Sequence, residues 1–453
     1  CIVMKCSFGI ETYFHFNSLN HSAIKLVKFV VIFYDFEIVL IFLMESINHH
    51  TLPNGIRVVH RQVTHTSISH IGIMLDMGSR DEKPHQQGLA HFWEHMAFKG
   101  TQKRSSLQII NRLEIVGGEL NAYTTKEKIC FHASVLTPHY ERALELLADI
   151  TFRSTFPEKQ VERERGVILE EMAMYYDSPE DAIQDDFDEI IFANHQLGKN
   201  TLGNQESVSN FTREDLSNFI SENLDTERVI FSSIGNIPFK KVVQFAEKFF
   251  KDIPAKSSDL VRVLPSVYVP QNQSITKPIS QAHVAIGRTA YSLTDKNRLP
   301  FFMLVNLLGG FGMNSRLNLA VRERNGLVYS IDAGYTPFID TGFWGIGYAT
   351  EVKRLSKVNS LILNELRKFR EVQLTKTQLQ NTKDQLMGQM AMSEEGNMSF
   401  MLMMAKSLLD MNRIDSLEDL FVQIKAVTAI QLQDLANEMF REEDLSYLTF
   451  LPE

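Results

Sequence analysis

The sequence predicts an α+β protein made of two domains. Its 453 residues exceed one typical domain, and two units of roughly 200 residues are the natural division of such a length. Residues 254–272 contain three prolines and three serines with little hydrophobic periodicity, which is typical of a linker. Strands and helices are mixed on both sides without strict β-α-β alternation, and this favours largely antiparallel sheets. We therefore expect domains at 44–254 and 273–453, joined by a linker at 255–272.

Local signals place the individual elements. Turn residues and apolar alternation predict strands, while helical periodicity and capping residues predict where helices begin and end. In the first half we expect strands at 56–60 and 67–77, a helix that carries residues 91–95, a helix that ends at Gly117-Gly118, extended chain at 121–135, helices at 138–153 and 157–176, and helices that begin after Ser178 and after Thr212. Beyond the linker we expect a strand at 282–287, helices up to residue 325, strands at 327–335 and 343–349, four further helical stretches and a last strand at 446–451.

The composition limits the class of function. A net charge of −9 argues against a general nucleic-acid binder, which would be basic. Three cysteines provide neither a disulfide framework nor an all-cysteine zinc site, and they fit a reducing compartment. The glycine-rich run at 309–312 lacks the G-K-[ST] ending of a phosphate loop. We therefore expect the chain to bind neither nucleic acid nor a nucleotide.

The first 43 residues differ in character from the rest of the chain. The stretch 29–44 is almost wholly apolar, but Asp35 and Glu37 interrupt it, whereas a transmembrane helix needs about 20 predominantly apolar residues. The stretch also lacks the clean apolar core and the cleavage site of a signal peptide. We expect Met44 to be the true start, residues 1–43 to be a non-native or unstructured extension, and the protein to be cytoplasmic. A membrane-anchored or exported protein is the less favoured alternative.

The most informative motif is H-x-x-E-H at residues 91–95. His91 and His95 lie four positions apart, so both rings project from one face of a helix and can reach one metal ion. Glu94, directly before the second histidine, can act as general base on a metal-bound water. The order is inverted relative to H-E-x-x-H and corresponds to the inverzincin pattern.

A catalytic zinc site needs a third protein ligand, which a glutamate, an aspartate or another histidine can supply. The helix expected at 157–176 offers the best candidates, because Glu164, Ile168 and Glu171 recur on one face. Carboxylates on an inward-facing stripe are unusual, since burying an unpaired charge is costly. Binding a cation, or a histidine that binds one, removes this cost. Glu170 falls on a different face and is expected to be solvated.

Residues 91–100 and 164–171 together closely resemble the pitrilysin (M16) family of zinc metallopeptidases. The resemblance implies that His91, His95 and Glu171 are the zinc ligands and that Glu94 is the catalytic base. It also implies that Glu164, seven residues before Glu171, orients a histidine ligand.

The resemblance extends over residues 50–453 and implies a fold. Family members consist of similar domains, each a mostly antiparallel sheet packed with helices, as in the LuxS and M16 metalloenzymes. The main departure is Trp93, which stands where leucine is usual. A larger ring so near the ligands is expected to alter packing or the shape of the pocket.

The second half carries a further resemblance, at residues 309–317 and 322–330. In active members an arginine and a tyrosine seven positions apart help to bind substrate and the transition state, and they match Arg322 and Tyr329.

The segment 118–125 is similar to the family's edge strand, to which a substrate peptide adds by main-chain hydrogen bonds. Asn121 and Ala122 are then expected to lie beside the scissile bond, and the substrate is expected to be flexible.

The resemblance thus implies a zinc-dependent endopeptidase that cleaves short or unfolded polypeptides, with one Zn²⁺ per subunit activating a water and Glu94 as general base. The chain has room for two of the repeated family units, which implies a clam-shaped dimer. We expect a homodimer in which the zinc of one subunit faces Arg322 and Tyr329 of the other, while a paralogous partner is an alternative. A non-catalytic scaffold or partner subunit is the rival function, although such subunits usually lose part of the metal motif.

Overall fold

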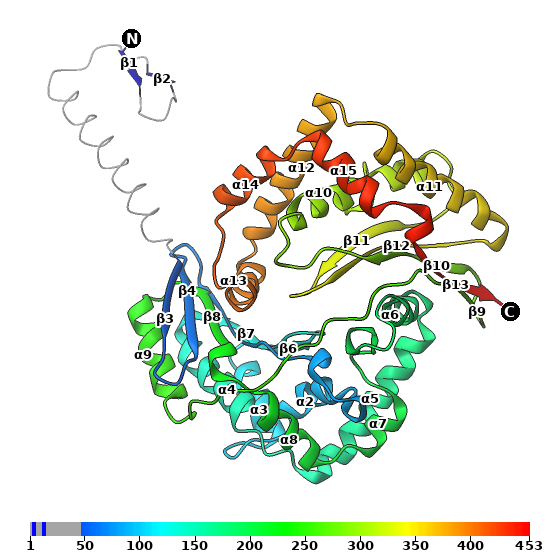
Figure 1. The fold of residues 1–453 in the computed structure, drawn as a ribbon. Helices are drawn as coiled ribbons and strands as arrows, with labels where there is room; N and C mark the ends of the chain where they lie inside the picture. Colours follow the sequence, from blue (N-terminus) through cyan, green and yellow to red (C-terminus); the bar gives the residue numbers. More distant parts are fainter. Residues whose placement is uncertain (1, 6–10, 15–46) are drawn as a thin grey trace.

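A computed structural model describes residues 2–5, 11–14 and 47–453 (Figure 1). Residues 47–453 form a six-stranded sheet and a five-stranded sheet, each packed with helices. This arrangement confirms the α+β class expected from the sequence. Strands β1 (Ile2–Lys5) and β2 (Glu11–Phe14) form a separate antiparallel pair. The rest of the expected extension 1–43 and Met44, and with them the whole apolar stretch at 29–44, lie outside the described residues.

The first domain is built on the six-stranded sheet, in the order β3-β4-β8-β5-β7-β6. Its strands are β3 Ile47–Thr51, β4 Arg57–Gln62, β5 Ile68–Leu75, β6 Glu119–Thr124, β7 Ile129–Leu136 and β8 Val229–Gly235. Its helices are α2 Leu89–Ala97, α3 Ser106–Glu114, α4 Tyr140–Phe152, α5 Glu158–Asp177, α6 Pro179–Ile191, α7 Gln205–Asn210, α8 Arg213–Asn223 and α9 Phe239–Phe250. Neighbouring strands are antiparallel except β4 and β8, which are parallel. Strand β6 is at the edge of the sheet.

The second domain is built on the five-stranded sheet, in the order β11-β12-β10-β13-β9. Its strands are β9 Asn272–Lys277, β10 Ala282–Thr289, β11 Ile331–Pro337, β12 Gly342–Thr350 and β13 Ser446–Pro452. Its helices are α10 Arg298–Gly309, a short π-helix at Asn318–Glu323, α11 Leu355–Glu371, α12 Lys376–Glu394, α13 Asn397–Met411, α14 Leu417–Ala426 and α15 Ala429–Met439. Only β13 and β9 pair in parallel within this sheet.

The structure departs from the sequence prediction at several elements. Strand β8 was not predicted, because it is buried along its whole length and an apolar run without alternation has no strand periodicity. The extended chain expected at 121–135 is a hairpin, in which Thr125 N–H donates to Lys128 O at 2.8 Å and closes the turn between β6 and β7. Five helices, not four, follow β12, because α12 and α13 are separated only by Glu395 and Gly396.

One helix of each domain packs on the sheet of the other domain (Figure 1). Helix α6 of the first domain packs on the second sheet, where Ile183 and Phe187 share a buried cluster with Phe450 of β13. Helix α13 of the second domain packs on the first sheet, where Met401 and Met404 form another buried cluster with strand residues. The packing of α6 and α13 therefore depends on contacts across the domain boundary.

The close approach of α13 requires a residue without a side chain at Gly72 of β5. A Cβ atom there would lie 3.1 Å from Met401 Sδ and 3.2 Å from its Cε. We expect Gly72→Val to lower the free energy of unfolding by about 1–3 kcal/mol, the usual cost of overpacking. Urea unfolding will measure this, and Gly72→Val combined with Met401→Ala should cost less than the two single changes added together. Gly334→Val is the control, because a Cβ atom at Gly334 has no neighbour within 4 Å; equal costs at both glycines would contradict the prediction.

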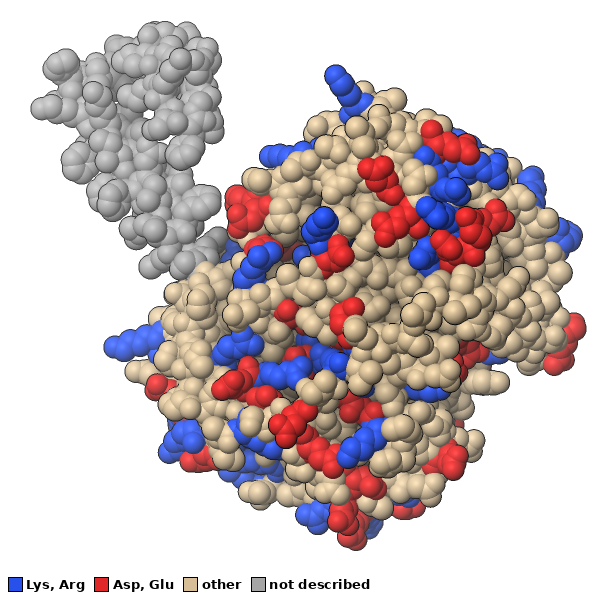
Figure 2. Space-filling view, in the orientation of Figure 1, with Lys and Arg blue, Asp and Glu red and all other residues tan. Residues whose placement is uncertain are grey.

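The linker has no regular secondary structure from residue 254 to residue 271, but ion pairs anchor it. The Arg262 guanidinium donates to Asp81 at 2.9 Å and to Asp76 at 3.0 Å. Lys128 pairs with Asp76 and also with Asp410 of α13, both at 2.7 Å. Burial alone would raise the pKa of Asp76, but the surrounding cations, first Lys128 and then Arg262, lower it below its ordinary value. On the face shown in Figure 2, basic and acidic side chains mix along the boundary between the domains.

A second ion-pair group joins the domains at the turn between β11 and β12. Arg80 donates to both carboxylate oxygens of Asp340, at 2.7 and 2.5 Å, and to Glu127 at 2.6 Å. Glu127 also accepts from the Ile339 main-chain N–H at 3.2 Å. The Arg80 side chain is 1% exposed and the Glu127 side chain 8%, whereas the Asp340 side chain is partly open to solvent.

Among the described residues, no helix combines the length and the apolar character that a membrane crossing requires.

Candidate metal centre

Helix α2 carries the H-x-x-E-H motif, and its N-terminus is held by a buried carboxylate. Glu82 accepts from the main-chain N–H groups of Gly88 at 2.9 Å and Ala90 at 2.7 Å, which satisfies two donors that the helix itself leaves free. Gly88 has φ +95°, and a Cβ atom there would lie 2.4 Å from Leu202 O. The residues before the motif therefore fix where α2 begins.

His91, His95 and Glu171 converge between α2 and α5. The two imidazole rings lie 4.6 Å apart between centroids, as the i, i+4 spacing predicts. Glu171 places its carboxylate oxygens 3.8 Å from His91 Nε2 and 3.4 Å from His95 Nε2. One ligand atom from each residue lies within 4.8 Å of the others, and within the described residues this is the only such group of three or more histidine, cysteine or acidic side chains.

The donor set fits a zinc ion. Two imidazole nitrogens and one carboxylate oxygen form the protein ligand set of several hydrolytic zinc enzymes. Zinc binds such ligands at about 2.0–2.2 Å, so tetrahedral ligand atoms are roughly 3.4 Å apart. The His–Glu171 separations of 3.4 and 3.8 Å are close to this value. The longer of them exceeds the length of a hydrogen bond, so Glu171 does not hydrogen-bond His91 Nε2, which within the described residues is available to a cation.

The surroundings shift the pKa values of the two histidines in opposite directions. Burial, and then the charge of His95, lower the pKa of His91 to about 4, so His91 is a neutral imidazole. Burial alone would also lower the pKa of His95, but hydrogen bonds and charges from Glu164 and Glu171 raise it to about 9. In the metal-free protein, His95 therefore keeps a proton at neutral pH, and a metal ion has to displace it.

Glu164 lies behind His95, and two cationic partners balance its negative charge. His95 donates its Nδ1–H to Glu164 Oε2 at 3.2 Å, and Lys99 Nζ pairs with Glu164 Oε1 at 2.8 Å. Burial alone would raise the pKa of Glu164, but these two partners lower it, so the carboxylate stays ionised. The arrangement fixes the His95 ring with Nε2 toward Glu171. On the same helix Glu170 is exposed, as expected.

Glu94 projects from α2 toward the edge strand β6. Its Oε2 accepts from the Thr124 hydroxyl at 2.6 Å. Burial raises the pKa of Glu94, and the hydrogen bond from Thr124 partly opposes this. Sequence reasoning did not identify Thr124, Lys99 or Glu82. The only sequence signal for Thr124 is its position two residues after Ala122, on the same side of a strand.

Asn121 and Ala122 are on β6, at the free edge of the first sheet. Asn121 is exposed, and its side-chain Oδ1 accepts from the Ala122 main-chain N–H at 2.8 Å. The Ala122 N–H therefore already bonds a side chain, which an incoming peptide strand would have to replace.

Arg322 and Tyr329 lie together but in the second domain. Arg322 is in the π-helix, with its guanidinium carbon 5.9 Å from the centre of the Tyr329 ring. The Tyr329 side chain is 90% exposed. Within the described residues, neither side chain makes a hydrogen bond or ion pair to His91, His95 or Glu171. In the described part of the chain the pair thus belongs to the second domain and is not bonded to the three converging side chains.

Trp93 points away from the ligands into the core of the first domain. Its side chain is fully buried, and its ring meets Phe131 of β7 edge-on at 5.8 Å between centroids. The indole Nε1 has no hydrogen-bond partner among the described residues. The position of Trp93 favours an effect of its larger ring on the packing of the core behind α2.

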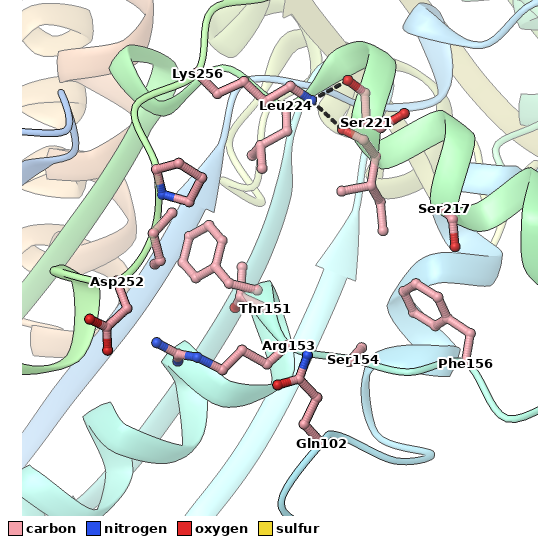
Figure 3. A pocket seen from close by; sticks show the side chains of 14 residues that line it. Gln102, Thr151, Arg153, Ser154, Phe156, Ser217, Ser221, Leu224, Asp252 and Lys256 are labelled. Carbon is pink, nitrogen blue, oxygen red and sulfur yellow. Dashed lines mark hydrogen bonds between the residues drawn. The ribbon is translucent and has the colours of Figure 1, made fainter.

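A separate cavity of about 520 Å³ lies at the C-terminal ends of α4 and α8 (Figure 3). Lys256 donates there to the main-chain oxygens of Ile220 and Ser221, and Arg153 donates to Phe249 O at 3.1 Å. These cations cap helix ends, where they interact favourably with the carbonyl groups. The cavity contains none of the three converging metal-type ligands.

Comparison with known proteins gives consistent similarities. Residues 57–205 match the family model described as Insulinase (Peptidase family M16), and residues 210–386 match Peptidase M16 inactive domain. An uncharacterized zinc protease of Bacillus subtilis is 32% identical over 398 residues, covering 88% of this chain and 96% of that protein. Another, from Streptomyces coelicolor, is 32% identical over 416 residues, covering 89% of each chain.

Solved structures agree in fold. A peptidase M16 inactive domain from Pseudomonas fluorescens superposes with a TM-score of 0.83 at 18% identity, covering 90% of this chain and 98% of that one. A protease from Helicobacter pylori superposes with a TM-score of 0.82 at 21% identity, covering 90% and 100%.

Proposed function

The chain belongs to peptidase family M16, and from this premise we propose that it is a zinc-dependent endopeptidase that cleaves short or unfolded polypeptides. The observation that carries the proposal is the convergence of His91, His95 and Glu171 beside Glu94. Relatives at about one-third identity are named zinc proteases, which supports a metallopeptidase at the level of the family. The complete ligand set favours an enzyme over a non-catalytic scaffold or partner subunit.

In the proposed reaction, His91, His95 and Glu171 hold the metal, and zinc bound there would supply Lewis acidity and a water activated at neutral pH. Glu94 accepts a proton from the attacking water and later delivers it to the leaving amine. Glu164 keeps the His95 ring oriented throughout.

The free edge of β6 is the proposed binding site for the substrate. A peptide would add to β6 as a further strand through main-chain hydrogen bonds near Asn121 and Ala122. Only an extended, flexible segment offers its main chain in this way, which is the reason for proposing unfolded or short substrates.

We assign Arg322 and Tyr329 a role across a subunit interface. Their place in the second domain, without a bond to the three converging side chains among the described residues, and the 90% exposure of Tyr329 support a homodimer in which this pair faces the partner's metal centre. There Tyr329 would donate to the developing oxyanion, and Arg322 would hold the substrate main chain. A paralogous partner with the same pair would serve equally.

The function is tested by cleavage of a peptide library by the purified protein. We expect cleavage that a chelator abolishes and added zinc restores, with one zinc ion per subunit by elemental analysis. Cleavage that persists in chelator would overturn the proposal. No cleavage after zinc loading of the homodimer would also overturn it, and would favour the scaffold function.

Zinc affinity should depend on pH in a defined direction. Because the pKa of His95 is raised to about 9 in the metal-free protein, its proton competes with zinc. We therefore expect the apparent affinity to increase as the pH rises toward about 9, and zinc binding at neutral pH to release protons. Calorimetry in buffers of different ionisation enthalpy measures the proton release. An affinity that does not change over this range would contradict the prediction.

A further inference from the structure

Thr124 is the last residue of β6, and its hydroxyl donates to Glu94 at 2.6 Å. This length is typical of a strong hydrogen bond from a hydroxyl to a carboxylate. The bond occupies Oε2 of Glu94. Within the described residues no side chain or main-chain group donates to the other oxygen, Oε1, which leaves it as the atom available to accept a proton.

Strand alternation places Thr124 on the side of β6 that faces α2. Leu120 and Ala122 pack against the core cluster that contains residues of α2, whereas Tyr123 packs against the opposite cluster, which contains α13. Thr124 has the same parity as Ala122, so it lies on the α2 side. One short strand thus carries both the proposed peptide-binding main chain and the donor to the proposed base.

We propose that Thr124 is a positioning residue that ties the general base Glu94 to the substrate-binding strand. This inference rests on the proposed function and deepens it. The terminal torsion of a glutamate is broad, so an untethered Glu94 carboxylate would sample many orientations. With Oε2 held by the edge strand, Oε1 is kept at a constant position relative to a peptide paired with β6. Catalysis is sensitive to such placement, since a misplacement of about 1 Å can cost about 100-fold in rate.

The test compares Thr124→Val, which is nearly isosteric and removes the hydroxyl, with Thr124→Ser, which keeps it. For Thr124→Val we expect kcat to fall about 10- to 100-fold with KM within about twofold of wild type. Thr124→Ser should recover most of kcat. Zinc content and the thermal midpoint should stay close to wild type in both. Thr124→Ala gives a second hydroxyl-free variant if Thr124→Val folds poorly.

Thr336→Val in β11 is the matched control, because it makes the same chemical change on a strand of the other domain. A Thr124→Val enzyme that binds zinc and keeps wild-type kcat, while Glu94→Gln is inactive, would overturn the positioning role and leave the proposed function intact. Thr124→Ser as impaired as Thr124→Val would also overturn it, because the hydroxyl would then not be the cause. A wild-type protein without zinc-dependent cleavage would overturn both.

Discussion

Replacing Glu94 with glutamine is expected to abolish peptide cleavage while zinc remains bound. Glutamine has nearly the same shape, and its amide oxygen can still accept from Thr124, but it cannot take a proton from water. General acid–base catalysis contributes about 10²- to 10⁴-fold, so kcat/KM should fall by at least about 100-fold. Because Glu94 is not among the three converging ligands, zinc content should not change. Cleavage of a quenched peptide and elemental analysis of the same preparation measure the two effects.

Glu170→Gln provides the control for this prediction. Glu170 is an exposed glutamate on α5, next to Glu171 in sequence but on another face of the helix. The Glu170→Gln variant should retain both peptide cleavage and bound zinc. If metal-loaded Glu94→Gln cleaved peptides at the wild-type rate, Glu94 would not be the base. If it lost zinc, Glu94 would have a role in metal binding in addition to that of a general base.

Replacing Arg80 with methionine is expected to destabilise the folded protein by about 3–5 kcal/mol, the usual cost of leaving a buried charge without its partner. Arg80 is 1% exposed and joins Glu127 of the first domain to Asp340 of the second. Its loss would leave the carboxylates of Glu127 and Asp340 side by side with less positive charge to balance them. Urea unfolding measures the free-energy change, and limited proteolysis within 255–272 reports whether the domain boundary loosens.

Lys83→Met is the matched control, because Lys83 forms a similarly short ion pair with Glu222, at 2.7 Å, on the surface. Both of those side chains are about half exposed, so the change should cost less than about 1 kcal/mol. Equal costs for Arg80→Met and Lys83→Met would show that the ion pair between the domains contributes no more than a surface pair.

Part of the candidate site could be predicted from the sequence because the relevant rules are short-range. The i, i+4 spacing of His91 and His95 dictates a shared helix face, and the same periodicity puts Glu164 and Glu171 on one face of α5. Thr124 could not be predicted in this way. Its partner Glu94 is 30 residues earlier in the chain, and only the packing of β6 beside α2 brings the two together.

The fold shows the same division. Alternating strands such as β12 and capped helices such as α8 followed from local patterns. Strand β8 did not, because it is buried on both faces and has no alternation. The exchange of α6 and α13 between the domains also could not be predicted, since an apolar helix face does not specify which sheet will cover it.

The sequence by itself determined the α+β class and the helix faces that His91 shares with His95 and Glu164 shares with Glu171. Each of these depends on spacing within one helix, one strand or one stretch of turn residues. The tertiary structure decided that α2 and α5 bring His91, His95 and Glu171 within 4.8 Å, that Thr124 holds Glu94, and that Arg322 and Tyr329 lie in the other domain. These are contacts between segments far apart in the chain, and they form only when the sheets and the exchanged helices bury their apolar faces together.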